Sequence, residues 1–225
     1  MRAGILGKLC GILIAVSASA QATAAPLSLQ ASGRITSSSI GELPVDTPWS
    51  LRVVFDPAGA VDANLNPNFG LYTGVITSLH ATVGGLAFAL ADWTDANVTI
   101  TDEPPFPFFT AEQVNFQWFR PVGVPADDRF ALLGLQATAF PPAGLLASDS
   151  LFTSAAAFQA FFDAAPPTFF YCASFPAGSG CSASTGAIGT AATLRFAEVP
   201  EPATAGLLAL ALGALGLSRA RRTRS

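Results

Sequence analysis

The sequence predicts an all-β domain that forms an antiparallel β-sandwich, and a jelly roll is one arrangement that fits the pattern. One short helix in the domain and a C-terminal transmembrane helix complete the prediction. Apolar and polar residues alternate with a period of two in many short segments, as in half-buried strands. Turn-forming pairs such as Asp56-Pro57 and Pro141-Pro142 separate these segments. Only 12% of the residues are charged and 51% are hydrophobic, so the chain can bury a large core.

Candidate strands follow one another along most of the chain. Residues 27–35 and 49–55 alternate cleanly, and residues 72–83 are rich in β-branched side chains. Gly84-Gly85 then predicts a hairpin turn. Further candidate strands span residues 86–90, 97–101, 114–120, 129–139, 169–175 and 191–199. Eight or more short strands favour a sandwich, and the pattern leaves their order open.

One segment, residues 148–165, has helical spacing instead. Leu151, Phe152, Ala155 and Phe158 recur at intervals of one, three and four. Ser148 or Asp149 is the expected N-cap. The chain holds 18 phenylalanines, most of which we expect in the core, because phenylalanine is among the residue types that are most often buried.

The first 24 residues have the order of a signal peptide. Basic Arg2 and Lys8 precede an apolar run over residues 9–16, and small residues follow. The run is too short for a stable membrane anchor. We expect cleavage after Ala24, with cleavage after Ala20 as the alternative. Cys10 lies at the start of the run, where we expect it to be removed with the signal.

The last residues, 199–225, contain three successive parts. Pro200, Glu201 and Pro202 form an extended strip, because proline disfavours a helix on both sides. Residues 203–218 carry no charge and would span about 24 Å as a helix, a thin membrane span. A basic cluster follows, which the positive-inside rule keeps in the cytoplasm. The cluster consists of Arg219, Arg221, Arg222 and Arg224.

This order resembles the PEP-CTERM sorting signal. The resemblance covers about the last 27 residues and implies recognition of Pro200, Glu201 and Pro202 by an exosortase, a membrane-embedded cysteine transpeptidase. It also implies that residues 203–218 form the membrane helix and that the arginines stop transfer. A plain C-terminal anchor helix is the alternative reading of the same residues. On either reading, residues 25–198 form an extracytoplasmic domain.

The charges of the middle of the chain exclude one class of partner. Residues 25–200 hold fourteen acids against five arginines, whereas the basic ends reduce the overall net charge to −4. An acidic domain repels phosphate backbones, so we expect no nucleic-acid partner. The expected partners are signal peptidase, the exosortase and, at least transiently, the cytoplasmic membrane. By resemblance, exopolysaccharide is a further partner.

Two cysteines remain in the mature domain. Export to an oxidising compartment favours a Cys172–Cys181 disulfide. The segment between them contains Pro176 and several glycines, so it can turn back on itself. Closing a loop of about ten residues contributes on the order of 2–3 kcal/mol in the chain-entropy model.

Candidate catalytic and metal-binding residues are few. His80 is the only histidine and lies in a strand-like run, and the chain has no nucleophile-elbow sequence. Asp62, Asn64 and Asn66 resemble half of a calcium loop, but Pro67 stands where glycine belongs, so a polar turn is the main reading. Three acid pairs could serve as glycosidase carboxylates or as loop charges. These pairs are Asp92/Asp95, Asp102/Glu103 and Asp127/Asp128.

The functional expectation is therefore an exported structural or surface protein of the envelope or matrix, without enzymatic activity or cofactor. A carbohydrate-binding module is the first alternative, and exposed Trp93, Trp118 or Phe108 on a concave face would favour it. A secreted hydrolase that uses two carboxylates is the second.

Overall fold

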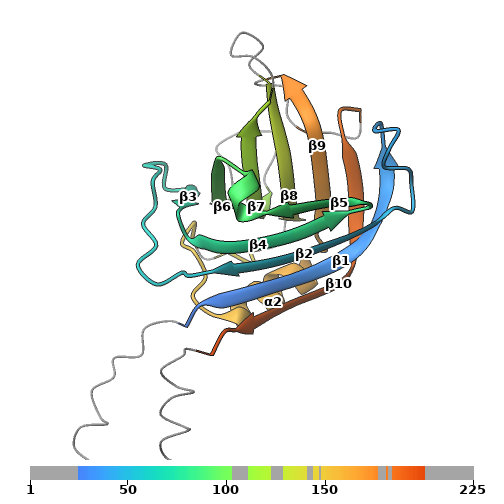
Figure 1. Cartoon of the computed structure of the whole chain (residues 1–225). Helices are drawn as coiled ribbons and strands as arrows, with labels where there is room; N and C mark the ends of the chain where they lie inside the picture. The colour runs from blue at the N-terminus through green and yellow to red at the C-terminus, as the bar shows by residue number, and fades with distance from the viewer. Residues whose placement is uncertain are drawn as a thin grey trace, which may run out of the picture.

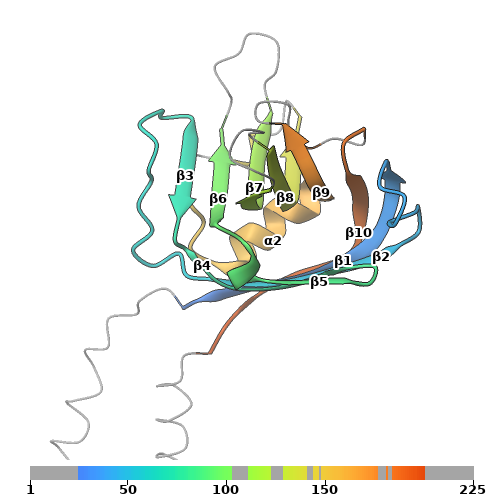
Figure 2. The same cartoon turned by 45° about the horizontal axis from the view of Figure 1, so that its top comes forward.

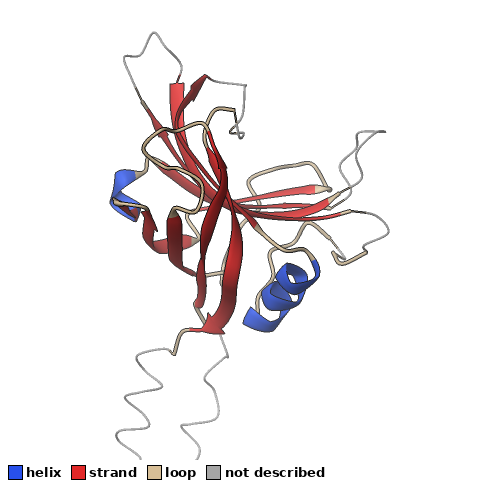
Figure 3. Ribbon diagram, turned by 90° about the vertical axis from the view of Figure 1, so that its right-hand side faces the viewer, coloured by secondary structure: helices blue, strands red, loops and turns tan. Residues whose placement is uncertain are grey.

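The computed structural model describes residues 25–102, 111–122, 129–140, 144–146, 148–176, 181 and 184–200. Strands make up most of their regular structure, and the one α-helix is the longer of two helical segments (Figure 3). In chain order the elements are β1 (Leu27–Ser38), β2 (Pro48–Phe55), β3 (Phe69–Thr73), β4 (Ile76–Val83), β5 (Leu86–Ala89), η2 (Leu90–Asp92), β6 (Asp95–Thr101), β7 (Glu112–Pro121), β8 (Arg129–Ala139), α2 (Ala155–Ala164), β9 (Thr168–Pro176) and β10 (Ala187–Glu198). The all-β prediction is confirmed.

The ten strands form one antiparallel sheet with the order β3-β6-β7-β8-β9-β10-β1-β2-β4-β5 (Figure 1). The sequence predicted two packed sheets, and this part of the prediction is wrong. The pairing of β10 with both β9 and β1 joins the meander β6–β9 to the strands β1, β2, β4 and β5. The two halves of the one sheet therefore pack face to face as two layers of a sandwich would.

The sheet bends at β10. Residues 187–190 of β10 pair with β9 on one side, and the full length of β10 pairs with β1 on the other. Beyond Thr190 the strand follows β1 alone, so the two halves separate. The register between β1 and β10 shifts twice, at Ser32/Gly33 and at Ile35/Ser37. Such irregularities bend a strand and increase its twist, which turns the second half of the sheet over the first.

Glycines permit close contact at this bend. A Cβ atom on Gly189 would lie 2.6 Å from the carbonyl oxygen of Arg34 and 2.6 Å from the Trp49 indole nitrogen. A Cβ on Gly33 would collide with the carbonyl oxygen of Thr190. Only residues without a side chain fit here, and the Trp49 indole covers the two glycines from the inner face of the sheet.

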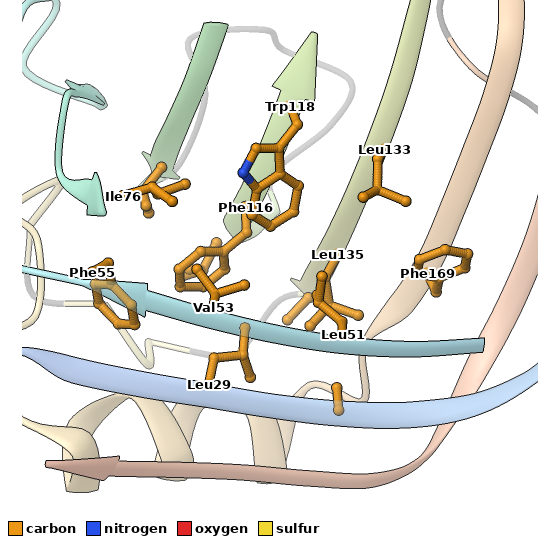
Figure 4. Close-up of a cluster of buried hydrophobic side chains, with 14 of the residues drawn as sticks. Leu29, Leu51, Val53, Phe55, Ile76, Phe116, Trp118, Leu133, Leu135 and Phe169 are labelled. Carbon is orange, nitrogen blue, oxygen red and sulfur yellow. The ribbon is translucent and has the colours of Figure 1, made fainter. Parts of the chain in front are cut away.

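The core lies between the two halves (Figure 4). Leu29, Leu51 and Val53 come from β1 and β2, and all three are at most 2% exposed. They face Phe116 on β7 and Phe169 on β9, which are fully buried. Each strand contributes alternate residues to this layer, as the period of two predicted.

The helix α2 lies in the angle between the halves (Figure 2). Phe158, Phe161 and Phe162 form its buried face. The Phe158 ring stacks on Phe196 of β10, with centroids 5.0 Å apart, and meets Phe116 of β7 at 5.9 Å. The helix thus joins both halves where β9 no longer accompanies β10.

The helix begins later than predicted. Its N-cap is Ser154, whose hydroxyl accepts a hydrogen bond from the backbone N–H of Ala157. Ser148 and Asp149 were the predicted caps, and that prediction is wrong. The Tyr72 hydroxyl donates to the carbonyl oxygen of Asp149 and accepts from the N–H of Leu151, which holds this stretch against β3. This long-range contact competes with the local helical preference.

The predicted strand over residues 72–83 is two strands, β3 and β4. Gly74 divides them with φ +71°, a left-handed conformation that glycine adopts readily. β3, before this glycine, pairs with β6 at one edge of the sheet, whereas β4, after it, pairs with β2 and β5 near the opposite edge. The hairpin predicted at Gly84-Gly85 is confirmed, because Val83 pairs with Leu86.

Candidate functional site

The two ends of the domain lie side by side. β1 and β10 are antiparallel, and Leu27 stands opposite Glu198. The backbone N–H of Val199 donates to the carbonyl oxygen of Pro26 at 2.7 Å. The chain therefore enters and leaves the fold at one point, which we call the terminal clasp (residues 26–27 and 198–199).

The sorting strip begins directly after the terminal clasp. Pro200 is exposed and is the last residue that the structure describes. The rest of the predicted tail lies outside the described residues, as do the signal peptide and the Ala24 cleavage site. These tail residues are Glu201, Pro202, the span 203–218, Arg219, Arg221, Arg222 and Arg224. Within the part that the structure describes, no helix is both long and apolar enough for a membrane crossing.

Cys172 and Cys181 form a disulfide, with Cα atoms 5.8 Å apart. Cys172 lies on β9 and is fully buried, on the outer side of the sheet beside Leu132 and Phe170. A Cβ on Gly186 would meet the Cys172 sulfur, so the returning chain packs tightly against the bridge. The bond ties the middle of β9 to the segment that leads into β10.

The structure brings the proposed calcium residues together in a different role. Asp62, Asn64 and Asn66 lie in the loop before β3, and each Oδ1 accepts the N–H of the residue two positions later. Asp62 Oδ1 also accepts from Leu71 N–H at 2.8 Å. These are consecutive Asx turns, which satisfy the loop's own backbone. Among the described residues, no three His, Cys, Asp or Glu side chains lie together in a way that could hold a metal ion.

The candidate acids that the structure describes do not form a cluster. Asp92 and Asp95 are exposed, and Asp92 accepts from the N–H of Ala89. Glu112 is the one buried carboxylate in the described ranges, and it accepts from Leu145 N–H at 2.8 Å. Glu103 and the Asp127/Asp128 pair lie outside these ranges, whereas Asp102 is half-buried at the end of β6.

The tryptophans do not form an exposed platform. Trp118 is fully buried, and Trp93 is 8% exposed under the Arg120 guanidinium, whose carbon lies 5.4 Å from the ring centroid. Phe108 lies outside the described residues. The aromatic surface that was expected to favour carbohydrate binding is therefore not built by these two tryptophans.

A groove of about 410 Å³ instead crosses the outer face of β10, β1, β2, β4 and β5. One row of outward-facing residues consists of Arg195, Gln30, Arg52 and His80, which are paired across neighbouring strands. The last three line the groove, and Arg195 ends the row beside it. We call this the cationic row. The parallel hydroxyl row consists of Thr193, Ser32, Ser50 and Thr82. The Ser32 and Thr193 hydroxyls lie 2.8 Å apart, as do those of Ser50 and Thr82.

Sequence reasoning missed both rows. The alternation in β1, β2 and β4 does identify these residues as outward-facing, which is the signal that was present. Which strands are neighbours depends on the sheet order, so the rows themselves were not predictable.

The outer face of the other half is richer in amides. A second groove, of about 400 Å³, is lined by Gln117, Gln136 and Thr168 beside Phe119 and Phe170. Nearby, Asn97 and Asn115 are more than nine-tenths buried, and their side-chain oxygens accept no hydrogen bond. This face is neutral where the cationic row is charged.

The chain matches the family model of the PEP-CTERM protein-sorting motif over residues 198–222. Comparison with curated proteins and with solved structures found no match. The matched segment starts at the last residue of β10, in the terminal clasp, and includes the Pro-Glu-Pro strip, the apolar span and three of the four terminal arginines. The predicted resemblance is therefore confirmed. The motif implies an exosortase as the sorting partner, export, and processing while anchored in the membrane, so the chain carries the PEP-CTERM sorting motif of exported proteins that an exosortase processes.

Proposed function

We propose that the mature domain is a non-enzymatic structural or surface component of the cell envelope or extracellular matrix, delivered there by exosortase processing. The observation that carries this proposal is the junction between the folded domain and the motif. Four residues separate Glu198 from the predicted helix start at Ala203, and the five steps between these two Cα atoms span at most about 18 Å in an extended chain. The domain therefore folds and is presented close to the membrane surface.

The terminal clasp supports processing of a folded substrate. Pro200 is exposed, whereas Val199 is held by its bond to Pro26. An enzyme in the membrane can therefore reach the strip without opening β10. Signal peptidase would act on the same side of the domain, because Ala24 precedes Pro26 by two residues.

The arrangement of acids supports a role without catalysis. A glycosidase needs two carboxylates about 5–9 Å apart across a cleft. Among the described residues, no carboxylate lines the cationic-row groove or the amide groove, and Asp56 is the one carboxylate that lines a third groove, between residues 56–63 and 73–77.

The test replaces the recognition strip in the native host. We expect Glu201→Gln, or Pro200→Ala with Pro202→Ala, to abolish processing and to leave the protein in the membrane fraction with its tail uncut. Intact mass and cell fractionation measure both effects. Glu42→Gln is the matched control, because it removes the same charge at an exposed site outside the segment that matches the motif. Unchanged mass and location in the strip variants would contradict sorting by this motif.

Carbohydrate binding is the second candidate function. The observation that favours it is the pair of grooves on the outer faces, one lined by hydroxyls, Arg52 and an amide, and the other by amides beside aromatic rings. Both kinds of lining offer hydrogen-bond partners for sugar hydroxyls. A glycan array probed with the exported protein tests it, and the absence of binding to any glycan would remove it.

A further inference from the structure

The cationic row places two arginines on one outward face without acidic partners. Arg52 and Arg195 flank Gln30 on the two strands next to β1, so their Cα atoms lie roughly 10 Å apart at the usual strand spacing. Both side chains are exposed, and neither guanidinium group makes a hydrogen bond or an ion pair with another described residue. Arg34, by contrast, donates to the carbonyl oxygen of Asp46 at 2.8 Å.

This placement is unusual for a domain of this charge. Fourteen acids accompany five arginines between residues 25 and 200, yet no carboxylate lines the groove around Arg52. Two guanidinium groups in one row, two strands apart, raise the local potential and attract anions. A guanidinium binds carboxylates in a bidentate manner, and its planar shape gives the contact a direction.

The hydroxyl row determines what kind of anion fits. Ser32, Ser50 and Thr82 lie one step along the strands from the arginines, in the same groove. Their hydroxyls both donate and accept, as the hydroxyls of a sugar ring require. A ligand that covers both rows therefore carries negative groups spaced like the two arginines, which lie two strands apart, and neutral hydroxyls between these groups.

Other polyanions fit this face less well. The most exposed large apolar side chains, Leu65, Val61 and Phe140, do not line the groove. Phe88 does line it, but its ring packs against Trp93 and Tyr171, so no fully exposed large apolar side chain of the described residues is offered there for insertion into a bilayer. A nucleic acid offers a phosphate at every step and few free hydroxyls for the hydroxyl row. An acidic polysaccharide carries free hydroxyls on every sugar beside its carboxylates.

We propose that the groove over β10, β1, β2 and β4 binds an acidic, carboxylate-bearing polysaccharide, with Arg52 and Arg195 on the carboxylates and the hydroxyl row on the sugar hydroxyls. The proposal rests on export, which exposes the face to extracellular glycans, and it gives the carbohydrate-binding candidate a ligand class. It does not depend on the structural role, so failure of glycan binding leaves the processing experiment unaffected.

The experiment measures binding of the exported, purified protein to three probes: polygalacturonate, neutral dextran and vesicles of phosphatidylglycerol with phosphatidylethanolamine. We expect polygalacturonate to bind, with affinity that falls as salt rises. Arg52→Gln and Arg195→Gln should each weaken binding by about tenfold, and the double variant by about 100-fold. Arg34→Gln is the matched control, since it removes the same charge from the same face at a guanidinium that is already bonded, and it should change affinity by less than about threefold.

Thermal unfolding of each variant shows that the exposed substitutions leave the fold intact. Loss of affinity with an unchanged midpoint supports the proposal. Equal binding of dextran and polygalacturonate, binding of the vesicles alone, no binding to any probe, or equal losses in Arg34→Gln and Arg52→Gln would each overturn it.

Discussion

The indole of Trp49 stacks on the phenyl ring of Phe169, with centroids 4.4 Å apart and ring planes within 10° of each other. Trp49 belongs to β2 and Phe169 to β9, so the stack joins the two halves of the sheet across the bend. The stack lies beside two glycines. Gly33 of β1 stands opposite Trp49, and Gly189 of β10 stands opposite Phe169. This contact is therefore the best single probe of how the sheet folds on itself.

Removing the Trp49 ring should strongly destabilise the domain. We expect Trp49→Ala to lower the free energy of unfolding by about 3–5 kcal/mol, because it leaves a large cavity in the core. Trp49→Phe keeps an aromatic ring on Phe169 and removes an indole N–H that is buried without a partner, so it should cost less. Urea unfolding measures both values. Equal losses in the two variants would show that the stack itself contributes little.

A side chain at Gly189 should disturb the bend. Gly189→Ala brings a Cβ within 2.6 Å of the Arg34 carbonyl oxygen, so the backbone must move. We expect a loss of about 1–3 kcal/mol, as for overpacked core sites. Gly41→Ala is the matched control, because a Cβ there meets nothing within 4 Å. The expectation fails if both substitutions shift the unfolding midpoint equally.

The disulfide should stabilise the domain measurably. Cys172→Ala with Cys181→Ala should lower the free energy of unfolding by about 2 kcal/mol, because the loop between the cysteines is short and the chain-entropy gain grows slowly with its length. Reduction of the wild-type protein should have a similar effect. A reduced wild type as stable as the oxidised one would contradict this.

Stability should fall at alkaline pH because of Tyr72. Burial raises the pKa of its phenol, and the charges of Asp62 and Asp149 raise the pKa further, although the Leu151 N–H opposes them. The folded state thus keeps the proton above pH 10, where the unfolded chain loses it. The stabilisation is complete below the unfolded pKa and is lost as pH rises through the folded pKa.

Tyr72→Phe tests this pH dependence. The variant should unfold more easily at pH 7, by about 1–3 kcal/mol, because the Leu151 N–H loses its acceptor. Between pH 10 and 11.5, its free energy of unfolding should decline less steeply than that of the wild type. Burial also raises the pKa of Tyr171, so some slope should remain. Identical slopes would exclude Tyr72 as a source.

The Asx turns at Asp62 should be independent of calcium. Asp62→Ala should cost about 1–3 kcal/mol, because two backbone N–H groups lose their acceptor. Asp62→Asn keeps an oxygen in place and should cost less. We expect calcium and a chelator to leave the wild-type midpoint unchanged. A calcium-dependent rise that disappears in Asp62→Asn would favour the calcium site instead.

Local patterns predicted most of the strands and little of their arrangement. Residues 129–139 were predicted as a strand with the bounds that β8 has, since alternation and turn residues are local signals. The division at Gly74 escaped because both flanking segments are β-branched and apolar. Ser154 was missed as a cap because the competing contact, from Tyr72 to Leu151, comes from residues 79 positions apart.

The candidate site also has one part that the sequence predicted and another part that it did not. The sequence by itself determined the sorting tail, because Pro200, Glu201 and Pro202, the apolar span and the arginines act through local composition and order. Only the tertiary structure decided that this tail starts at a clasp formed with Pro26, and that Arg52 and Arg195 share a face with the hydroxyl row. Those relationships depend on β10 pairing with β1 across most of the chain length. Such a pairing is selected by the burial of the whole aromatic core, and no short stretch of residues encodes it.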